Sequence, residues 1–371
     1  MAPNPTEIAT IIAGGSVFSY WTSVEVERTF GTGVSYLTMT CEEISSSAGA
    51  ATLKLAPGDS VTGLLAGQLA ITGNVDVRQV MYDAKNHGVQ IRVCSLTQNT
   101  VAGTVNGQPG QYQNSTFQQM AQAECQKVGV NVKIIGSPSG ANTPFERVSV
   151  HIGETVFQFC ERLARMVNLH VVDDANGNLN FFRASGGGSG GSLSLVEGQN
   201  ILSARMVMRN DMLTARITVP IHQPGTDAHW STDAQNISAT VTNPYFNGIR
   251  NLVLVAEQTG NKTFAQMRAN HQLNLDMIQF LEVVITVQGW LCPDGTLWIS
   301  KLTSGADGTV DVTVTSPMLW PGSTTSVPLK LRGVKHMQDN NNGTRTELTL
   351  CLEIGLAPNA PQQQGVVPTE G

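Results

Sequence analysis

Few stretches of this sequence have the residue types and spacing that chemistry needs. Gly187–Gly191, GGSGG, formally satisfies G-x-S-x-G, the turn that presents a serine nucleophile in α/β-hydrolases. That turn requires a strand before it and a helix after it, whereas this one lies in the Gly/Ser-rich run 185–192 and is followed by strand-like SLSLV. We interpret the run as a flexible connector.

Metal ligation is also weakly indicated. Asp173–Asn178, DDANGN, lacks the sixth-position glycine and the terminal glutamate of a calcium loop, so it favours a hairpin turn. His271 lies near an apolar stripe and is expected in a core or interface. His222 and His229 lie in a polar stretch and could share a metal only in the folded chain. The histidines are dispersed without HxH or HxxxH spacing, at positions 87, 151, 170, 222, 229, 271 and 336.

No enzyme motif emerges from the remaining residues. The sequence has no P-loop, dinucleotide fingerprint or HExxH. The carboxylate pairs Glu42–Glu43 and Asp173–Asp174 are adjacent, so in a strand their side chains point to opposite faces. The tryptophans at 21, 230, 290, 298 and 320 could form a sugar-binding strip, but packing at the end of a barrel is the commoner use. We predict no enzyme, with no catalytic, cofactor-binding or metal residues.

Composition excludes further classes. The net charge is −6, without a local Lys/Arg cluster, which argues against nucleic-acid binding as the main role. Charged residues make up only 13%, about half the usual share of about 25%. No apolar run approaches the ~20 residues of a membrane span, and Glu7 and two prolines argue against a signal peptide. The six cysteines form no CxxC and are expected to be free thiols.

The elements that must position any site are mainly strands. Residues 1–107 carry many short strand patterns without helices, which predicts an antiparallel barrel or sandwich. Within it, Phe18, Tyr20, Val24 and Val26 alternate with polar residues and predict one strand with one buried face. Further strand patterns follow at 34–40, 68–82 and 88–96.

Residues 108–192 predict a middle α/β domain built on a repeat. The segments 116–133 and 155–172 match at an offset of 39 residues. In each copy Thr116 or Thr155, or the residue before it, can cap a helix. Gly129 and Asn168 fall at equivalent places and tolerate the left-handed conformation that ends a helix. One such unit cannot bury its own apolar stripe, so we expect the two helix–strand units to pack together.

Strand patterns return in residues 193–357. We expect this region to carry a polar insertion or mobile loop at 221–262 and a helix at 263–280. Clean alternation at Val310, Val312 and Val314, and again at 348–354, predicts strands after that helix. Residues 358–371 are expected to be a disordered tail.

The order of these motifs resembles the baseplate hub (central tail hub) proteins of contractile-tailed bacteriophages, closest to the phage Mu type. The resemblance lies in WTSVEVERTF, in LAPGDSVTGLLAGQLAITGNVDVRQ, in the two helix–strand units, in GQNILSARMVMRNDMLTARITV and in GWLCPDGTLW. No one motif is decisive, and their order over about 300 residues carries the weight. CSLTQNTVAGTV departs from the charged stretch that many relatives have there.

The resemblance implies a mainly β fold in which two similar antiparallel barrels bracket the duplicated helix–strand domain. The first, tube-like barrel would span residues 1–107 and the second residues 193–357. It implies a homotrimeric ring of pseudo-sixfold symmetry that adapts the sixfold tail tube to the threefold central spike and forms part of the DNA ejection channel. The implied partners are further copies of the chain, the tube or tube-initiator protein, the spike and the baseplate wedges, with the tape measure protein as a further candidate. DNA would only pass through, and stable membrane association is not expected. The implied location is the virion tail baseplate, assembled in the host cytoplasm.

Other functions stay open at this point. A β-rich tail-tip module could bind carbohydrate or a cell surface through exposed Trp230, Trp320 or the polar insertion. The chain could also be the hub of a tail-like bacteriocin or another phage-like contractile injection system. A cell-wall hydrolase fused into a hub would need a separate catalytic domain, for which the chain leaves no room.

Overall fold

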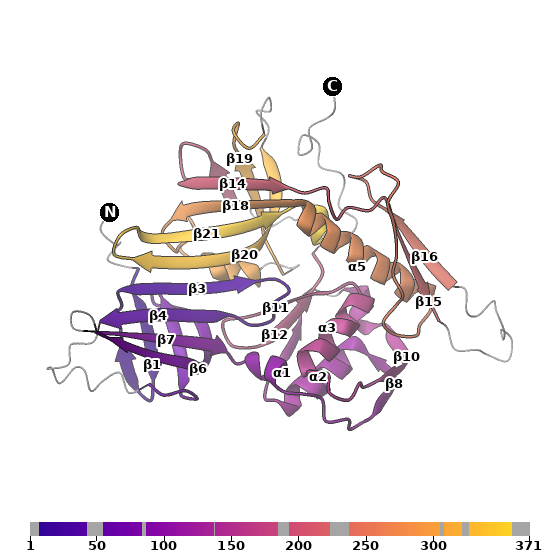
Figure 1. Ribbon diagram of the computed structural model, residues 1–371, viewed down its shortest axis with the longest axis horizontal. Helices are drawn as coiled ribbons and strands as arrows, with labels where there is room; N and C mark the ends of the chain where they lie inside the picture. Colours follow the sequence, from indigo (N-terminus) through magenta and orange to yellow (C-terminus); the bar gives the residue numbers. More distant parts are fainter. Residues whose placement is uncertain are drawn as a thin grey trace.

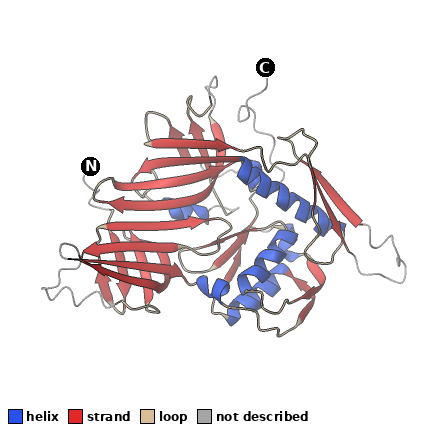
Figure 2. Cartoon of the chain, viewed as in Figure 1, coloured by secondary structure: helices blue, strands red, loops and turns tan. Residues whose placement is uncertain are grey.

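The computed structural model describes residues 7–42, 55–83, 87–136, 138–184, 193–222, 237–304, 308–320 and 326–357. The connector at 185–192 and the tail at 358–371 lie outside the described residues. As predicted, the described chain is mainly β with few helices. Figure 2 shows long strands stacked side by side, with the longer helices gathered beyond one end of them.

One 13-stranded sheet combines strands from both ends of the chain (Figure 1). Its main path runs β14-β18-β21-β20-β3-β4-β7-β6-β5-β1-β2, with β19 and β13 branching from β20. The amino-terminal strands are β1 (Ala9–Ala13), β2 (Ser16–Phe18), β3 (Ser23–Thr29), β4 (Tyr36–Glu42), β5 (Ser60–Leu65), β6 (Gln68–Tyr82) and β7 (His87–Ser95). The carboxy-terminal strands are β13 (Leu193–Val196), β14 (Ser203–Met208), β18 (Leu281–Gln288), β19 (Asp311–Thr315), β20 (Val327–Asp339) and β21 (Gly343–Cys351).

The described strands form no closed barrel, so the prediction of two barrels is not confirmed. The path ends at β14 on one side and at β2 on the other. In between, β3 and β20 pair antiparallel over seven residues of β3, from Ser23 opposite Asp339 to Thr29 opposite Gly333. Alternation in a sequence predicts which side chains share a face, but not which strands become neighbours. The two halves therefore share one sheet.

The predicted strand through Phe18 and Val26 is wrong in its extent. The chain forms β2 up to Phe18 and starts β3 only at Ser23. Val24 and Val26 are buried as expected, but Tyr20, between the two strands, is 91% exposed. The alternation continued across the break because Tyr20, in the linker, falls at the period of a buried strand residue although its side chain is exposed.

The range 221–262 is also more regular than the insertion or mobile loop that we expected. Its described part contains β16 (Ile237–Thr242) and β17 (Asn251–Val253), which flank β15 (Arg216–Ile221) in a three-stranded sheet. Ile217, Val219 and Ala239 are buried where this sheet packs on helix α5 (Lys262–Phe280). Polar threonines on the outer face hid the strand pattern in the sequence.

The duplicated units form two equivalent helices, α2 (Phe117–Lys127) and α3 (Val156–Met166). Thr116 and Thr155 are their N-caps, and each takes part in a complete capping box with the glutamine three residues later. The offset between the helices is thus the 39 residues that the sequence predicted. Beyond each helix, Gly129 and Asn168 have φ of 75° and 53°, as the C-terminal pattern predicted.

Short strands complete the middle region. β9 (Val132–Ile134), β12 (Leu179–Phe182) and β11 (His170–Asp173) form one small sheet, and β8 (Gln111–Thr116) pairs with β10 (Pro144–Ser149). β12 runs parallel to β9 but antiparallel to β11, so the strands of the two units run in opposite directions. Three shorter elements of the chain are α1 (Gln98–Ala102), η2 (Ser139–Asn142) and η3 (Trp298–Leu302), and the last described turn is η4 (Glu353–Gly355).

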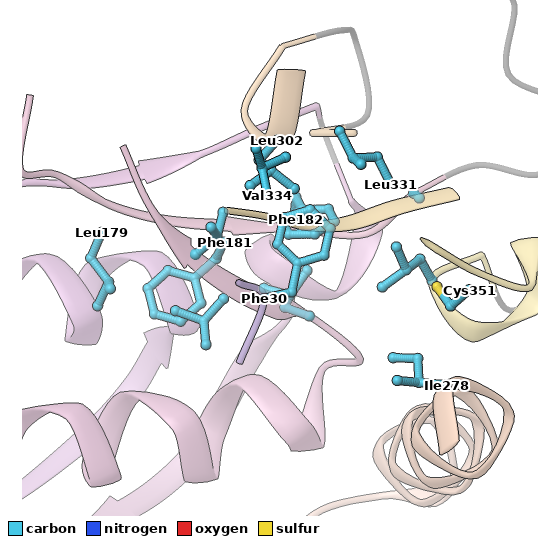
Figure 3. Packing of buried hydrophobic residues seen from close by; sticks show 14 of the residues in the cluster. Phe30, Leu179, Phe181, Phe182, Ile278, Leu302, Leu331, Val334 and Cys351 are labelled. Atoms are coloured by element: carbon cyan, nitrogen blue, oxygen red, sulfur yellow. The ribbon is translucent and has the colours of Figure 1, made fainter. Parts of the chain in front are cut away.

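A continuous apolar core joins these parts (Figure 3). The ring of Phe182, from the middle region, lies 4.6 Å from the ring of Phe30, which follows β3. Leu331 and Val334 of β20 are buried in the same cluster, as is Ile278 of α5. Because the core has no break between the halves, the main sheet and the helical region are held as one packed body.

Candidate functional site

The acidic turn at 173–178 is a structural turn. Asp174 Oδ1 accepts hydrogen bonds from the backbone N–H groups of Asn176 and Asn178, both at 3.0 Å. Its Oδ2 accepts from Lys133 Nζ at 2.9 Å. Both carboxylate oxygens therefore have protein donors, which is how an aspartate closes a tight turn.

Three histidines are buried and kept neutral. The His336 ring bonds with Thr346 Oγ1 at 2.8 Å and accepts from the Ile299 backbone N–H at 3.2 Å. Burial lowers the pKa of His336 to about 3 and the pKa of His170 to about 4. Burial also holds the pKa of His271 well below its usual range, and its ring lies 5.2 Å from the ring of His170.

No metal centre is formed by the described residues. They contain no group of three or more His, Cys, Asp or Glu side chains placed to hold an ion. Of the polar pair considered from the sequence, His222 is described and His229 is not. The cysteines are all buried and free, and burial raises the pKa of Cys292 and of Cys351 to about 12.

The tryptophans do not form an exposed strip in the described part of the chain. Trp290, Trp298 and Trp320 are all buried. Trp290 donates its indole N–H to the Met337 carbonyl at 3.2 Å, which fixes a turn of the second half on β20. Trp320 is not the exposed residue that a glycan-binding module would need, and Trp230 lies outside the described residues.

Within 7–42, 55–83 and the other described ranges, no helix has both the length and the apolar character needed to cross a bilayer.

The most extensive candidate surface is one face of the main sheet, which we call the open face. It is made by alternate residues of β14, β18, β21, β20, β3, β4, β7 and β6. In β18 and β21 these residues are partly exposed, whereas the residues between them are buried. Figure 2 shows η3 behind the strands and no helix in front of them, and Ile299 of η3 bonds to His336 on the buried side.

Side chains on the open face form rows that cross both halves. One row is Ser203, Thr286, Glu347, Lys335, Glu27 and Tyr36. The next is Gln288, Arg345, Met337, Glu25, Thr38 and Arg92. The rows therefore combine neutral polar side chains with charges of both signs. A pocket on this face is lined by such polar groups together with Leu202 and Met337.

The strands at the two edges of the open face are paired less completely than the strands between them. β14 is the terminal strand of the path and pairs with β18. At the other side, β5 pairs with β6 only from Gln68 to Asn74, whereas β6 continues to Tyr82 along β7. Leu202 beside β14, and Val80 and Met81 on the β6 extension, are about half exposed. Exposed apolar residues at a strand edge are typical of a contact with another chain.

Polar contacts hold the first half, the second half and the middle region in fixed positions relative to one another. Arg28 on β3 and Asp173 on β11 form an ion pair at 3.3 Å, and both side chains are fully buried. Glu7 accepts the Trp290 backbone N–H at 2.7 Å. Gln68 donates to the Gly295 carbonyl at 2.8 Å and accepts from the Leu297 N–H at 3.2 Å. Sequence analysis missed Arg28, although its place on the apolar face of Val24 and Val26 was a signal that it would need a buried partner.

The fold is that of phage tail proteins. The chain matches the 43 kDa tail protein of prophage MuSo2 from Shewanella oneidensis with a TM-score of 0.74 at 22% identity, covering 94% of this chain and 99% of that one. It matches a tail protein from Neisseria meningitidis MC58 with a TM-score of 0.76 at 18% identity, covering 95% and 98%.

Sequence comparison shows similarity to one group of phage tail proteins, those of the baseplate. Residues 8–93 match the model of the N-terminal domain of Mu phage GpP-like baseplate assembly proteins. Residues 97–183 match the second domain of gp44-like baseplate hub proteins. The chain is also 24% identical to the baseplate hub protein gp44 of Escherichia phage Mu over 365 residues, 97% of this chain and 89% of that protein. The resemblance to Mu-type baseplate hub proteins is thereby confirmed.

Proposed function

We propose that this chain is the structural hub of a contractile tail baseplate. Three copies would form a ring of pseudo-sixfold symmetry that connects the sixfold tail tube with the threefold spike. Similarity to a Mu hub protein over 97% of the chain supports the hub role. The structural observation that supports the proposed ring is the main sheet. Strands of the first and second halves are neighbours in it, and its path does not close on itself.

Each copy contributes two blocks of strands to the ring. β3, β4, β7 and β6 come from the first half, and β20, β21, β18 and β14 from the second. The blocks adjoin at β3 and β20, so one copy would present two four-stranded units in a row. Three copies then present six units, which is how a threefold ring can meet a sixfold tube.

The contact between copies would use the terminal strand β14 and the part of β6 that extends beyond its pairing with β5. We propose that β14 of one copy lies against the β6 extension, Val77–Tyr82, of the next. Both segments are six residues long. Exposed apolar side chains accompany each of them: Leu202 directly before β14, and Val80 and Met81 within the β6 extension. Contact between these two segments would continue the β-structure from one copy to the next around the ring.

The open face would then line the central channel, and the helical region would brace the ring from outside. The other proposed partners are the tube or tube-initiator protein, the spike and the wedge proteins, with the tape measure protein as a further candidate. The assembled part would reside in the virion tail baseplate after assembly in the host cytoplasm. No catalytic step is part of this function, in line with a relative named as a baseplate hub.

The test is the native mass of the purified chain and of two edge variants. Wild type should show a species of three times the 39.6 kDa chain, alone or after addition of tail partners. Leu202→Asp or Met81→Asp places a charge in the proposed contact and should lower the trimer fraction at least about tenfold, equivalent to about 1.4 kcal/mol.

Ile152→Asp is the matched control, because Ile152 is 96% exposed and lies in the helical region, between β10 and α3. It should leave the trimer fraction unchanged. A wild type that stays monomeric with every tail partner would refute the ring. Equal losses in all three variants would refute the edge contact.

A further inference from the structure

The open face of the main sheet has a charge arrangement that the hub role does not by itself require. Its basic side chains in the described strands are Arg92, Arg205, Arg332, Lys335 and Arg345. Each of them is in an ion pair with an acid on the same surface. Lys335 Nζ lies 2.8 Å from Glu25, and Arg92 lies 2.5 Å from Asp76.

The remaining bases are paired in the same way. Glu282 forms ion pairs with two arginines, Arg332 at 3.3 Å and Arg205 at 3.8 Å. Arg345 lies 3.2 Å from Asp339. The pairs join neighbouring strands: Lys335 and Glu25 link β20 to β3, and Arg205 and Glu282 link β14 to β18. The same face also carries Glu27 and Glu347, which gives the acids a small excess.

Such pairing changes what the surface can bind. A protein holds nucleic acid by placing Lys and Arg against phosphates and releasing counterions. A base that is already bound to a carboxylate must break that contact before it can bind a phosphate, and the nearby carboxylate repels the phosphate as well. Partly exposed ion pairs contribute little to the free energy of unfolding. Stability therefore does not explain why this face has so many ion pairs.

We propose that the open face is self-neutralised: its acids hold each of its bases in an ion pair. The bases are then not available to phosphates, and DNA passes along the face without being bound. This inference rests on the proposed function, because it places the open face on the channel wall. The partner is a duplex polyanion in transit. The acids Glu25 and Glu282 have the main part, because together they occupy three of the basic side chains, Lys335, Arg332 and Arg205.

The experiment compares the wild-type chain with Glu25→Gln/Glu282→Gln. Binding of a fluorescent duplex DNA is measured by anisotropy at about 50 mM and about 200 mM salt. The amides keep the size of the side chains but free three bases per copy. We expect weak or no binding by wild type and at least tenfold tighter binding by the variant. That gain should fall steeply at the higher salt, since each phosphate contact adds about −0.9 to the slope of log affinity against log salt.

The matched control is Glu146→Gln/Glu161→Gln, which changes the net charge equally. Glu161 pairs with Arg165 at 3.1 Å on α3, and Glu146 is exposed on β10, so both lie away from the open face. This control should bind DNA as weakly as wild type. Equal gains in both double variants, or wild-type binding as tight as that of the open-face variant, would overturn the proposal.

Native mass is recorded on the same samples. A trimer whose DNA binding does not respond to Glu25→Gln/Glu282→Gln overturns the self-neutralised face and leaves the hub ring intact. A chain that never assembles but shows the predicted gain overturns the ring and leaves the charge argument intact. The two proposals thus fail separately.

Discussion

At the scale of single residues, Arg28 is a fully buried charged side chain at the joint between the main sheet and the helical region. Its Nε lies 3.3 Å from Asp173 Oδ1 and 3.1 Å from Ser35 Oγ, and its Nη2 donates to the Ala70 carbonyl at 3.0 Å. Buried charges are tolerated only when they are paired and hydrogen-bonded. The pair therefore fixes the position of β11 on β3 more than it adds to net stability.

Removing one partner of this pair should be costly. Asp173→Asn leaves a buried guanidinium without its countercharge, and we expect the free energy of unfolding to fall by about 3–5 kcal/mol. Arg92→Gln breaks a pair in which both side chains are partly exposed and should change it by no more than about 1 kcal/mol. Urea denaturation measures both, and similar small losses would contradict the proposed joint.

The buried histidines predict loss of stability in acid. Burial lowers the pKa of folded His170 to about 4, against about 6.5 in the unfolded chain. As pH falls below about 6.5, His170 binds a proton in the unfolded state but not yet in the folded state. The stability that is present above pH 6.5 is therefore lost progressively down to about pH 4, at up to about 1.4 kcal/mol per pH unit for this residue.

His170→Phe should flatten this dependence, because phenylalanine fits beside Phe182, whose ring is 5.8 Å from the His170 ring, and takes up no proton. Unfolding free energies at pH 7.5, 6 and 5 give the slope. His222→Gln, at an exposed position, is the control and should keep the wild-type slope. A slope for His170→Phe as steep as that of wild type would contradict the assignment.

At the scale of elements, the sequence predicted best where local chemistry decides. The two helices of the repeat begin at the residues that Thr116 and Thr155 predicted, because a cap depends only on residues within one turn. Strands β6 and β7 also match their patterns. The break between β2 and β3, and the strands β16 and β17, were missed because their edges depend on distant packing partners.

The repeat predicts equal contributions from its two caps. Thr116→Ala and Thr155→Ala each remove the hydroxyl that accepts the N–H of Gln119 or Gln158, and each should lower the free energy of unfolding by about 1 kcal/mol. Thr→Ser at the same positions keeps the oxygen and should recover most of the loss. Chemical denaturation of the four variants tests this, and serine variants as unstable as the alanine variants would rule out capping as the cause.

Packing of the two units shows a feature that sequence spacing alone does not give. Cys125 Sγ lies 3.7 Å from Cys160 Sγ, and both are fully buried. In the 39-residue alignment these two are not equivalent: Cys125 matches Ala164, and Cys160 matches Ala121. Each helix thus places its cysteine against the other helix from a different turn, which fits two units that face one another.

At the scale of the whole molecule, the sequence indicated a mainly β chain of the hub type but not how its halves join. The pairing of β3 with β20 brings together residues about 300 positions apart, and no local pattern encodes it. The open face could not be predicted either, because it is made by side chains from eight strands in both halves. The division into domains at 107, 192 and 357 stays a prediction.

The account depends on one molecule supplying two adjacent sheet blocks to a closed ring. Single-particle electron microscopy of the trimer, or of the assembled baseplate, measures this most directly. We predict a ring with threefold symmetry, β14 of each copy beside the β6 extension of the next, and the open face toward a central opening. A ring of another symmetry, or a threefold ring in which the helical region lines the opening, would contradict the account.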